Sequence, residues 1–173
     1  MAQWYMLTLV GEDRAGIVAR VTQAIFEAGG CLGEASMMRL GGNFTIMLMV
    51  SLEGGEAGLR QALVPVAVDL SLRLHIDAIN GALHQHLVPN IQVRVTGADR
   101  AGIVAEVTGA LARIGFNILE LESDVAGDPK RPVYLMNIQG YSDQSLEILQ
   151  AAVAGLSAGG ILVDISAVDT LFG

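Results

Sequence analysis

The sequence predicts an α+β protein made of two small βαββαβ domains in tandem, each an antiparallel sheet with both helices on one face. The first observation is an internal repeat: GEDRAGIVARVTQAI begins at Gly11, and GADRAGIVAEVTGAL begins at Gly97. Residues 11–29 and 97–115 are identical at 12 of 19 positions. The second observation is that similar strand and helix patterns surround the repeat in both copies. A period of this length indicates a duplicated domain, since solenoid repeats are shorter.

The first strand and the first helix of each copy follow from the periodicity of apolar residues. Apolar residues alternate in Trp4–Val10 and in Ile91–Val95, which is typical of half-buried strands. We expect the next helices to end at Gly29-Gly30 and at Gly115, because a residue without Cβ most easily adopts the left-handed conformation found there. The helices carry apolar residues at the spacing of a helix packed on one side, namely Ile17, Val18, Val21, Ala24, Ile25 and Ala28, and Ile103, Val104, Val107, Ala110, Leu111 and Ile114.

The second half of each copy contains two strands, a helix and a last strand. In the first copy the two strands meet at Gly41-Gly42, which suits a tight hairpin. In the second copy we expect a longer hairpin loop within 125–133, where Pro129 and Pro132 impose turn geometry. The remaining predicted elements are helices at about 55–66 and 143–156 and strands near 70–76 and 160–166.

These elements divide the chain into two predicted domains with a linker between them. We expect the first domain at residues 1–80, the linker at 81–89 and the second domain at 90–173. The linker contains His84 and His86, an H-x-H pair without further ligands at metal spacing. We therefore predict no metal site, and nothing in the chain calls for a cofactor.

With both helices on one face, the other face of each sheet is left uncovered. In the first domain this face includes either Met47 and Met49, or Phe44, Ile46 and Leu48. Both sets are apolar, so either choice leaves little polar surface. Small sheets with an apolar second face and free edges usually pair or stack, and we expect a homo-oligomer.

Composition indicates a well-cored globular protein that does not bind nucleic acid directly. Hydrophobic residues make up 52% of the chain, charged residues 16%, and the net charge is −8. An acidic surface repels phosphate backbones, and no basic cluster is larger than Lys130-Arg131. Neither a membrane span nor a signal peptide is expected, because the apolar runs are short and no basic segment precedes the first one. The single cysteine, Cys31, fits a reducing cytoplasm.

The repeated loop connects a strand to a helix and has the features of an anion site. We expect Asp13 and Asp99 to cap the helices, because a carboxylate accepts from the unpaired N–H groups and favours the positive end of the dipole. The glycines allow close approach to the backbone, and the remaining N–H groups can bind a carboxylate or phosphate. A capped turn without a ligand explains the same residues and is the commoner arrangement for such a loop.

The repeated arginines, Arg14 and Arg100, favour a binding role over a simple turn. Arginine beside a helix N-terminus is unfavourable unless its charge has a use, because the dipole there is already positive. Each arginine can pair with a carboxylate ligand or with the neighbouring Asp13 or Asp99. An ion pair across the two copies is the structural alternative.

These residues resemble the ACT domain, in which D-R-x-G-[IL]-[VL] follows the first strand and G-x-N-I follows the first helix. The second copy has both motifs, DRAGIV at 99–104 and GFNI at 115–118, whereas the first has DRAGIV at 13–18 but GGCL at 29–32. Nearly the whole chain is similar to tandem-ACT proteins of the glycine cleavage system transcriptional repressor family. The resemblance implies a ferredoxin-like fold. It also implies a non-catalytic regulator that senses a small amino acid and acts through a protein partner, in transcriptional control of glycine and one-carbon metabolism.

The resemblance also implies where a ligand would bind. ACT domains typically pair edge to edge and hold an amino acid at the interface near the first loop. This chain departs from the family at Ala15 and Ala101, where proline is usual, and at Cys31, which replaces the asparagine found as Asn117 in the second copy. The implied ligand-binding residues are Gly11, Asp13, Arg14, Gly16, Ile17, Gly97, Asp99, Arg100, Gly102, Ile103 and Asn117.

Two functions other than ligand sensing share features with this sequence. Acylphosphatases share the βαββαβ order and use an arginine loop with a catalytic asparagine, but the loop here lacks their glycine-rich cradle. A structural interaction module whose pocket has degenerated is the second alternative. Cys31 is expected to be a buried structural thiol rather than a nucleophile, since no histidine motif accompanies it. Glu120 and Glu122 are expected on an exposed strand face, with a pocket lining as the alternative.

Overall fold

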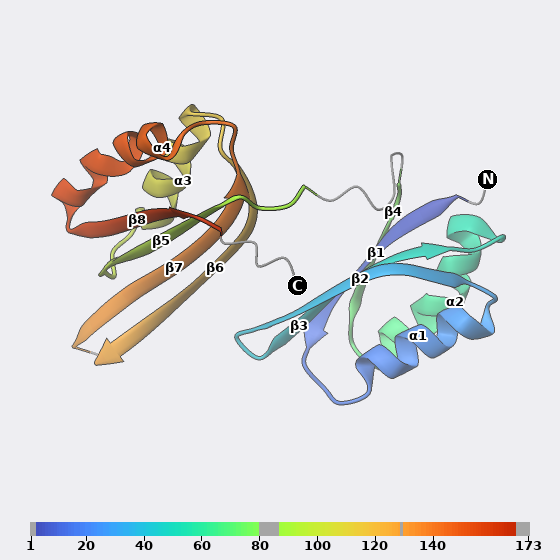
Figure 1. Ribbon diagram of the computed structural model, residues 1–173. Helices are drawn as coiled ribbons and strands as arrows, with labels where there is room; N and C mark the ends of the chain where they lie inside the picture. Colours follow the sequence, from blue (N-terminus) through green and yellow to red (C-terminus); the bar gives the residue numbers. More distant parts are fainter. Residues whose placement is uncertain (1–2, 80–86, 129, 169–173) are drawn as a thin grey trace. The chain divides into compact units, whose positions relative to one another are not determined.

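Two compact units make up the chain in the computed structural model, which describes residues 3–79, 87–128 and 130–168 (Figure 1). The units are Met1–Leu83, hereafter domain one, and His84–Gly173, hereafter domain two. Their boundary falls in the predicted linker 81–89, but residues 81–86 lie outside the described residues, so the linker limits stay a prediction. Each domain is an α+β unit of the predicted order.

Domain one is a four-stranded antiparallel sheet in the order β2-β3-β1-β4, with β2 and β4 at the edges. Both helices lie on the same face of the sheet (Figure 1). This is the predicted βαββαβ arrangement. Its elements are β1 (Trp4–Glu12), α1 (Ile17–Glu27), β2 (Cys31–Leu40), β3 (Asn43–Ser51), α2 (Gly55–Asp69) and β4 (Arg73–Ala78).

Domain two repeats this topology with the sheet order β6-β7-β5-β8. The duplicated residues occupy the same register: Gly11 pairs with Phe44 in domain one, and Gly97 pairs with Tyr134 in domain two. Its elements are β5 (Ile91–Ala98), α3 (Ile103–Arg113), β6 (Asn117–Asp128), β7 (Arg131–Tyr141), α4 (Leu146–Val153), the 3-10 helix η1 (Ala154–Gly159) and β8 (Ile161–Ala167).

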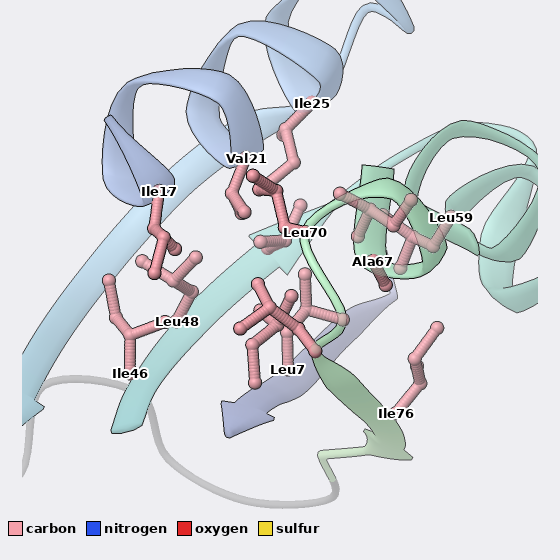
Figure 2. Packing of buried hydrophobic residues seen from close by; sticks show 14 of the residues in the cluster. Leu7, Ile17, Val21, Ile25, Ile46, Leu48, Leu59, Ala67, Leu70 and Ile76 are labelled. Carbon is pink, nitrogen blue, oxygen red and sulfur yellow. The ribbon is translucent and has the colours of Figure 1, made fainter. Parts of the chain in front are cut away.

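The core of each domain lies between the helices and one face of the sheet. Figure 2 shows this layer in domain one, where Ile17 and Val21 of α1 point toward Ile46 and Leu48 of β3. Because Ile46 and Leu48 are buried, the alternation of the strand places Met47 and Met49 on the uncovered face. Of the two predicted sets, Met47 and Met49 are therefore the one on the uncovered face. Phe44 is buried together with Ile46 and Leu48.

The hairpin of domain two differs from the prediction of a long loop. β6 continues to Asp128 and β7 begins at Arg131, so the two strands pair almost to the turn. Pro132 lies inside β7, opposite Gly127, rather than in a loop. A proline is tolerated near the start of a strand. Pro132 precedes Val133, and Val133 pairs with Ala98, the last residue of β5, so Pro132 lies outside the part of β7 that pairs with β5.

The second helices also differ from their predicted limits. α2 runs through Pro65 to Asp69, beyond the predicted end at 66, and burial of Ala67 favours this extra turn. In domain two the predicted helix 143–156 begins at Leu146 and changes after Val153 into η1.

Candidate functional site

The second glycine of each repeated loop is required by the backbone of the fold. Gly16 and Gly102 precede α1 and α3 with φ of 90° and 91°, a left-handed conformation that other residues adopt only with strain. Ile17 and Ile103, which follow them, are 1% and 2% exposed and belong to the two cores. These residues therefore do not need a ligand to explain their repetition.

The first glycine of each loop allows close packing against the turn that leads into the last strand. A Cβ on Gly11 would lie 2.6 Å from Leu72 Cδ2 and 3.1 Å from the Ser71 carbonyl oxygen. A Cβ on Gly97 would lie 3.0 Å from the Gly160 carbonyl oxygen. Both distances are shorter than ordinary contact, so the fold accounts for these two glycines as well.

The motif aspartates do not cap the helices, contrary to the prediction. Neither α1 nor α3 has a side-chain cap, because the N-cap position is taken by a glycine and the aspartate lies three residues earlier. In domain one, Asp13 Oδ2 instead pairs with Arg39 Nε at 2.6 Å, and the Asp13 N–H donates to the Gly42 carbonyl oxygen. Asp13 therefore ties the loop to the β2–β3 hairpin.

Asp99 has no such partner. Its N–H donates to the Pro132 carbonyl oxygen at 3.3 Å, but its exposed carboxylate makes no hydrogen bond or ion pair within the part of the chain that the structure describes. The register explains the difference. Arg39 and Phe44 are paired in domain one, and the corresponding pair in domain two is Val125 and Tyr134. Val125 of domain two thus occupies the position that Arg39 has in domain one.

The motif arginines do not pair with the neighbouring aspartates. In domain one, Arg14 Nη2 lies 3.0 Å from Glu12 Oε2. In domain two, the Arg100 guanidinium donates to both carboxylate oxygens of Glu106, at 2.8 and 2.7 Å. Each pair forms within its own domain, so the structural alternative of an ion pair between the copies is not needed to satisfy the charges.

The Arg100–Glu106 pair sits on the first turn of α3 and favours the charged form of both groups. The hydrogen bond from Arg100 lowers the pKa of Glu106 below its usual value, and the same bond raises the pKa of Arg100. Gly159 of η1 leaves room for the guanidinium, since a Cβ there would lie 3.0 Å from Arg100 Nη2. Arg100 is therefore held over the start of α3.

Domain two thus presents three complementary groups at one end of its sheet. They are the unpartnered carboxylate of Asp99, the guanidinium of Arg100 and the N-terminal N–H groups of α3, which no side chain caps. A carboxylate can hold an ammonium group, while the guanidinium and the helix N-terminus can hold a carboxylate. These are the two charged groups of a free amino acid.

Asn117 lies far from this loop in its own domain. It begins β6 opposite Tyr141, whereas Gly97 pairs with Tyr134, seven positions earlier on β7. At about 3.3 Å per residue, this separation along the strand is about 23 Å. The structure therefore does not bring Asn117 and the Asp99–Gly102 loop into one pocket of one domain. The exposed Asn117 amide makes no hydrogen bond among the described residues.

A cleft of about 840 Å³ lies in domain one, at the end of the sheet where Cys31 takes the place of Asn117. The expectation of a buried thiol is wrong, because Cys31 is exposed and lines this cleft. Small residues on α1 and α2 leave space for this cleft. It could not be predicted from the sequence, because it depends on how α1 packs on α2. Its lining includes Ala24, Glu27, Ala28, Ser51, Glu53, Gly58, Gln61 and Ala62.

Other expectations concern metals, the acidic strand and membranes. Among residues 3–79, 87–128 and 130–168 there is no group of His, Cys, Asp and Glu that could hold a metal ion, while His84 and His86 lie outside these residues. Glu120 and Glu122 lie on the exposed face of β6, as expected. Within the described residues, no helix is both long and apolar enough to cross a membrane.

Comparison with known proteins identifies the family of the two domains. The model of the ACT domain family matches the chain twice, over residues 4–77 and 90–164. UPF0237 protein YjhC of Lactococcus lactis is 32% identical over 83 residues, which are 46% of this chain and 95% of that protein.

Two solved structures share the fold over nearly the whole chain. A protein of unknown function from Galdieria sulphuraria has a TM-score of 0.79 and 23% identity, with coverage of 97% of this chain and 99% of that one. A protein described as a candidate glycine cleavage system transcriptional repressor has a TM-score of 0.71 and 19% identity, with coverage of 97% and 98%. The chain therefore belongs to the ACT domain family, and each of its two domains is an ACT domain.

Proposed function

We propose that this protein is a non-catalytic regulator that binds a small amino acid through domain two and acts by contact with a regulatory protein. Control of glycine and one-carbon metabolism is the process we propose. The observation that carries the proposal is the unpartnered carboxylate of Asp99 beside Arg100 and the uncapped start of α3. Two similarities support this choice of process. The chain is similar in fold to a candidate glycine cleavage system transcriptional repressor, and its sequence motifs resemble those of that family.

The three groups of domain two suit the two ends of an amino acid. The ligand carboxylate would accept hydrogen bonds from the N–H groups at the start of α3, where the helix dipole is positive. Its ammonium group would pair with Asp99. Arg100 has five N–H donors, of which two go to Glu106 and one to the Ala101 carbonyl oxygen, so two remain for the ligand.

Asn117 would take part from a neighbouring ACT domain in a homo-oligomer. Its amide has a donor and an acceptor and can bond both ends of an amino acid. Since the start of β6 is about 23 Å from the loop of the same domain along the strand, only another ACT domain can bring the two together. Domain one, with Cys31 at this position, supplies no such amide.

The same separation supports a non-catalytic role. An acylphosphatase-like site needs an arginine and an asparagine at one phosphate, and within domain two Arg100 and Asn117 stand at opposite ends of β7. The net charge of −8 likewise favours a protein partner over direct contact with nucleic acid. We infer a cytoplasmic location from the single, exposed thiol of Cys31.

A structural role is the second candidate function, and it applies to domain one. There Asp13 is held by Arg39 and Arg14 by Glu12, so the charges of the motif are used within the domain. We propose that domain one serves mainly as an interaction module. Residues Gly11, Asp13, Arg14, Gly16 and Ile17 would then stabilise the loop and bind no ligand.

Thermal unfolding in the presence of each of the twenty amino acids at millimolar concentration tests the proposal. At a hundred times its dissociation constant, a ligand stabilises the folded state by about 2.7 kcal/mol. For one domain of this size that corresponds to a rise in Tm of about 10 °C or more. We expect a small amino acid to produce this rise, Asp99→Asn and Arg100→Ala to abolish it, and the control Asp13→Asn to retain it. A wild-type chain that no amino acid stabilises would contradict the sensing role.

A further inference from the structure

The cleft in domain one lies between α1 and α2, apart from the repeated loop. Its lining comes from the last turn of α1, the first residue of β2, the connection from β3 to α2 and one side of α2. Among the described residues that line it, none belongs to the loop 11–17. Its volume of about 840 Å³ is within the range of about 300–1,000 Å³ that small-molecule sites occupy. The cleft is therefore separate from the amino-acid site proposed for domain two.

Small apolar residues form much of the lining. Ala24 and Ala28 are four residues apart at the end of α1, and Gly58, Ala62 and Val66 have the same spacing along α2. Residues at this spacing lie on one side of a helix, so each helix presents a row of small residues to the cleft. Ala24, Ala62 and Val66 also pack against the core of the domain. The floor of the cleft is thus apolar and continuous with the core.

Domain two shows that the fold does not require a small residue at the end of the first helix. The residue equivalent to Ala28 in the repeat is Ile114, which is half-buried and packs against the core of domain two. Because Ala28 lines the cleft, an isoleucine there would occupy part of the space. The open space at this position is therefore a feature of domain one and not of the shared fold.

The charged residues that line the cleft are both acidic, namely Glu27 and Glu53. Glu27 Oε1 accepts a hydrogen bond from Gln23 Nε2 at 2.8 Å, which leaves its second oxygen available. Glu53 makes no hydrogen bond or ion pair within residues 3–79, 87–128 and 130–168. A cleft lined by charges of one sign concentrates counter-ions, so this cleft attracts cations.

The arginines of the two helices do not neutralise these carboxylates. Arg20 of α1 is bound to Asp69 at 2.6 Å, and Arg60 of α2 is bound to Glu56 at 2.7 Å. Neither arginine lines the cleft. The negative charge of the cleft is therefore left without a basic partner among the described residues of α1 and α2.

Domain two has a different charge pattern at the corresponding positions. Arg113 is equivalent to Glu27 in the repeat, and strand register makes Asp143 equivalent to Glu53. These two residues have opposite charges, and Asp143 Oδ1 also accepts a hydrogen bond from the Tyr141 hydroxyl at 2.6 Å. The pair of acidic residues is thus specific to domain one.

We propose that this cleft is a ligand site for a small organic cation, in which an ammonium group is attached to an apolar body. The carboxylates of Glu27 and Glu53 would accept hydrogen bonds from the ammonium group, and the apolar body would cover the alanines of the floor. A metal ion fits less well, because the described residues contain no group of His, Cys, Asp and Glu that could hold one. A free amino acid is disfavoured, because its own carboxylate would be repelled by both acidic side chains.

Cys31 reports whether the cleft is occupied. It is the single cysteine of the chain, it is exposed, and it lines the cleft. A bound molecule should shield it from iodoacetamide, which is an uncharged thiol reagent. The alkylation rate of the full chain is measured against the concentration of cyclohexylammonium, cyclohexanol or cyclohexanecarboxylate, which share one body and differ in charge. The anionic probe tests the opposite preference, which the uncapped start of α2 at Gly54 would favour.

We expect cyclohexylammonium to slow the alkylation with a dissociation constant of about 1 mM, as suits a ligand of this size. Cyclohexanol should bind about tenfold more weakly, because it forms neither of the two exposed ion pairs, and the carboxylate should not bind. Glu27→Gln with Glu53→Gln keeps the shape of the cleft and should weaken cyclohexylammonium about tenfold for the same reason. The matched control is Glu120→Gln with Glu122→Gln, which removes the same charge from the exposed face of β6 and should bind as wild type does.

A steric variant and a second measurement make the test independent of charge and of the thiol. Ala28→Ile copies the residue of domain two and should also weaken the binding of cyclohexylammonium, while circular dichroism checks that the fold is kept. In NMR spectra of the full chain, cyclohexylammonium should shift the N–H signals of Gly29, Gly54 and Gly58, which line the cleft.

Three results would each overturn the proposal: equal protection by cyclohexylammonium and cyclohexanol, stronger protection by the carboxylate, or unchanged binding in the double glutamine variant. Cyclohexylammonium that neither protects Cys31 nor shifts these N–H signals would overturn it as well. The measurements contain no amino acid, and the variants leave Asp99 and Arg100 unchanged. A failure here is therefore distinguishable from a failure of ligand sensing in domain two.

Discussion

In domain one the motif aspartate, Asp13, is bound by Arg39 at 2.6 Å, whereas in domain two Asp99 is unpartnered among the described residues and Val125 replaces that arginine. The position of Glu106, which holds Arg100 in domain two, is taken in domain one by Arg20, which pairs with Asp69 instead. The two domains therefore share a loop backbone but direct its charges differently. The glycines of the repeated motif are thus required by the backbone of both domains, whereas its charged residues have different partners in each domain.

The largest expected effects test whether the two domains are separate folding units. Leu9 is fully buried in domain one, so Leu9→Ala should lower the free energy of unfolding of that domain by about 2–5 kcal/mol. Val95→Ala, at the equivalent position, should destabilise domain two alone. Hydrogen exchange resolved by residue would measure both. Equal loss of protection in both domains from either substitution would show that the chain unfolds as one unit.

The next largest effect concerns the shared backbone of the loop. Gly16→Ala and Gly102→Ala should each cost about 1–2 kcal/mol, because both glycines have left-handed conformations with φ near 90°. The control is Gly109→Ala inside α3, where the added Cβ would meet nothing closer than Arg113 Nη1 at 3.8 Å. It should stabilise domain two by about 0.5–1 kcal/mol. Chemical denaturation measures all three, and equal costs at Gly102 and Gly109 would refute the backbone explanation.

A smaller effect should appear in domain two in acid. Because Arg100 lowers the pKa of Glu106 in the folded protein, the pair contributes stability above the usual glutamate pKa of about 4.3 and loses it as the pH falls through the lowered value. Glu106→Gln should remove this part of the acid dependence. NMR titration of Glu106, with Tm measured between pH 7 and pH 3, tests it. A Glu106 pKa at or above the usual value would contradict the pairing.

Much of the fold was predictable because local patterns agree with the tertiary structure. The alternation in Trp4–Val10 and the helical stripe after Gly16 both point into the core, and the repeat made each copy a check on the other. The hairpin of domain two was mispredicted because Pro132 indicates a turn locally, although the register of β7 accommodates it.

The charges of the site were less predictable, because their partners come from distant strands and depend on register. That Arg39 reaches Asp13 follows from the pairing of β2 with β3, and the two are 26 positions apart in sequence. The same holds for the sheet faces. The sequence left open whether Met47 or Ile46 is outward, and only burial of Ile46 decides it.

The central claim is that Asp99 is free to bind a ligand because Val125 replaces the arginine that occupies Asp13. The most direct measurement is the amino-acid-induced rise in Tm of Val125→Arg, which alters no candidate ligand-binding residue, beside wild type and Arg39→Val. We predict that Val125→Arg ties up Asp99 and loses the rise, while Arg39→Val retains it. A rise that persists in Val125→Arg, or disappears in Arg39→Val, would contradict the assignment of the site to domain two.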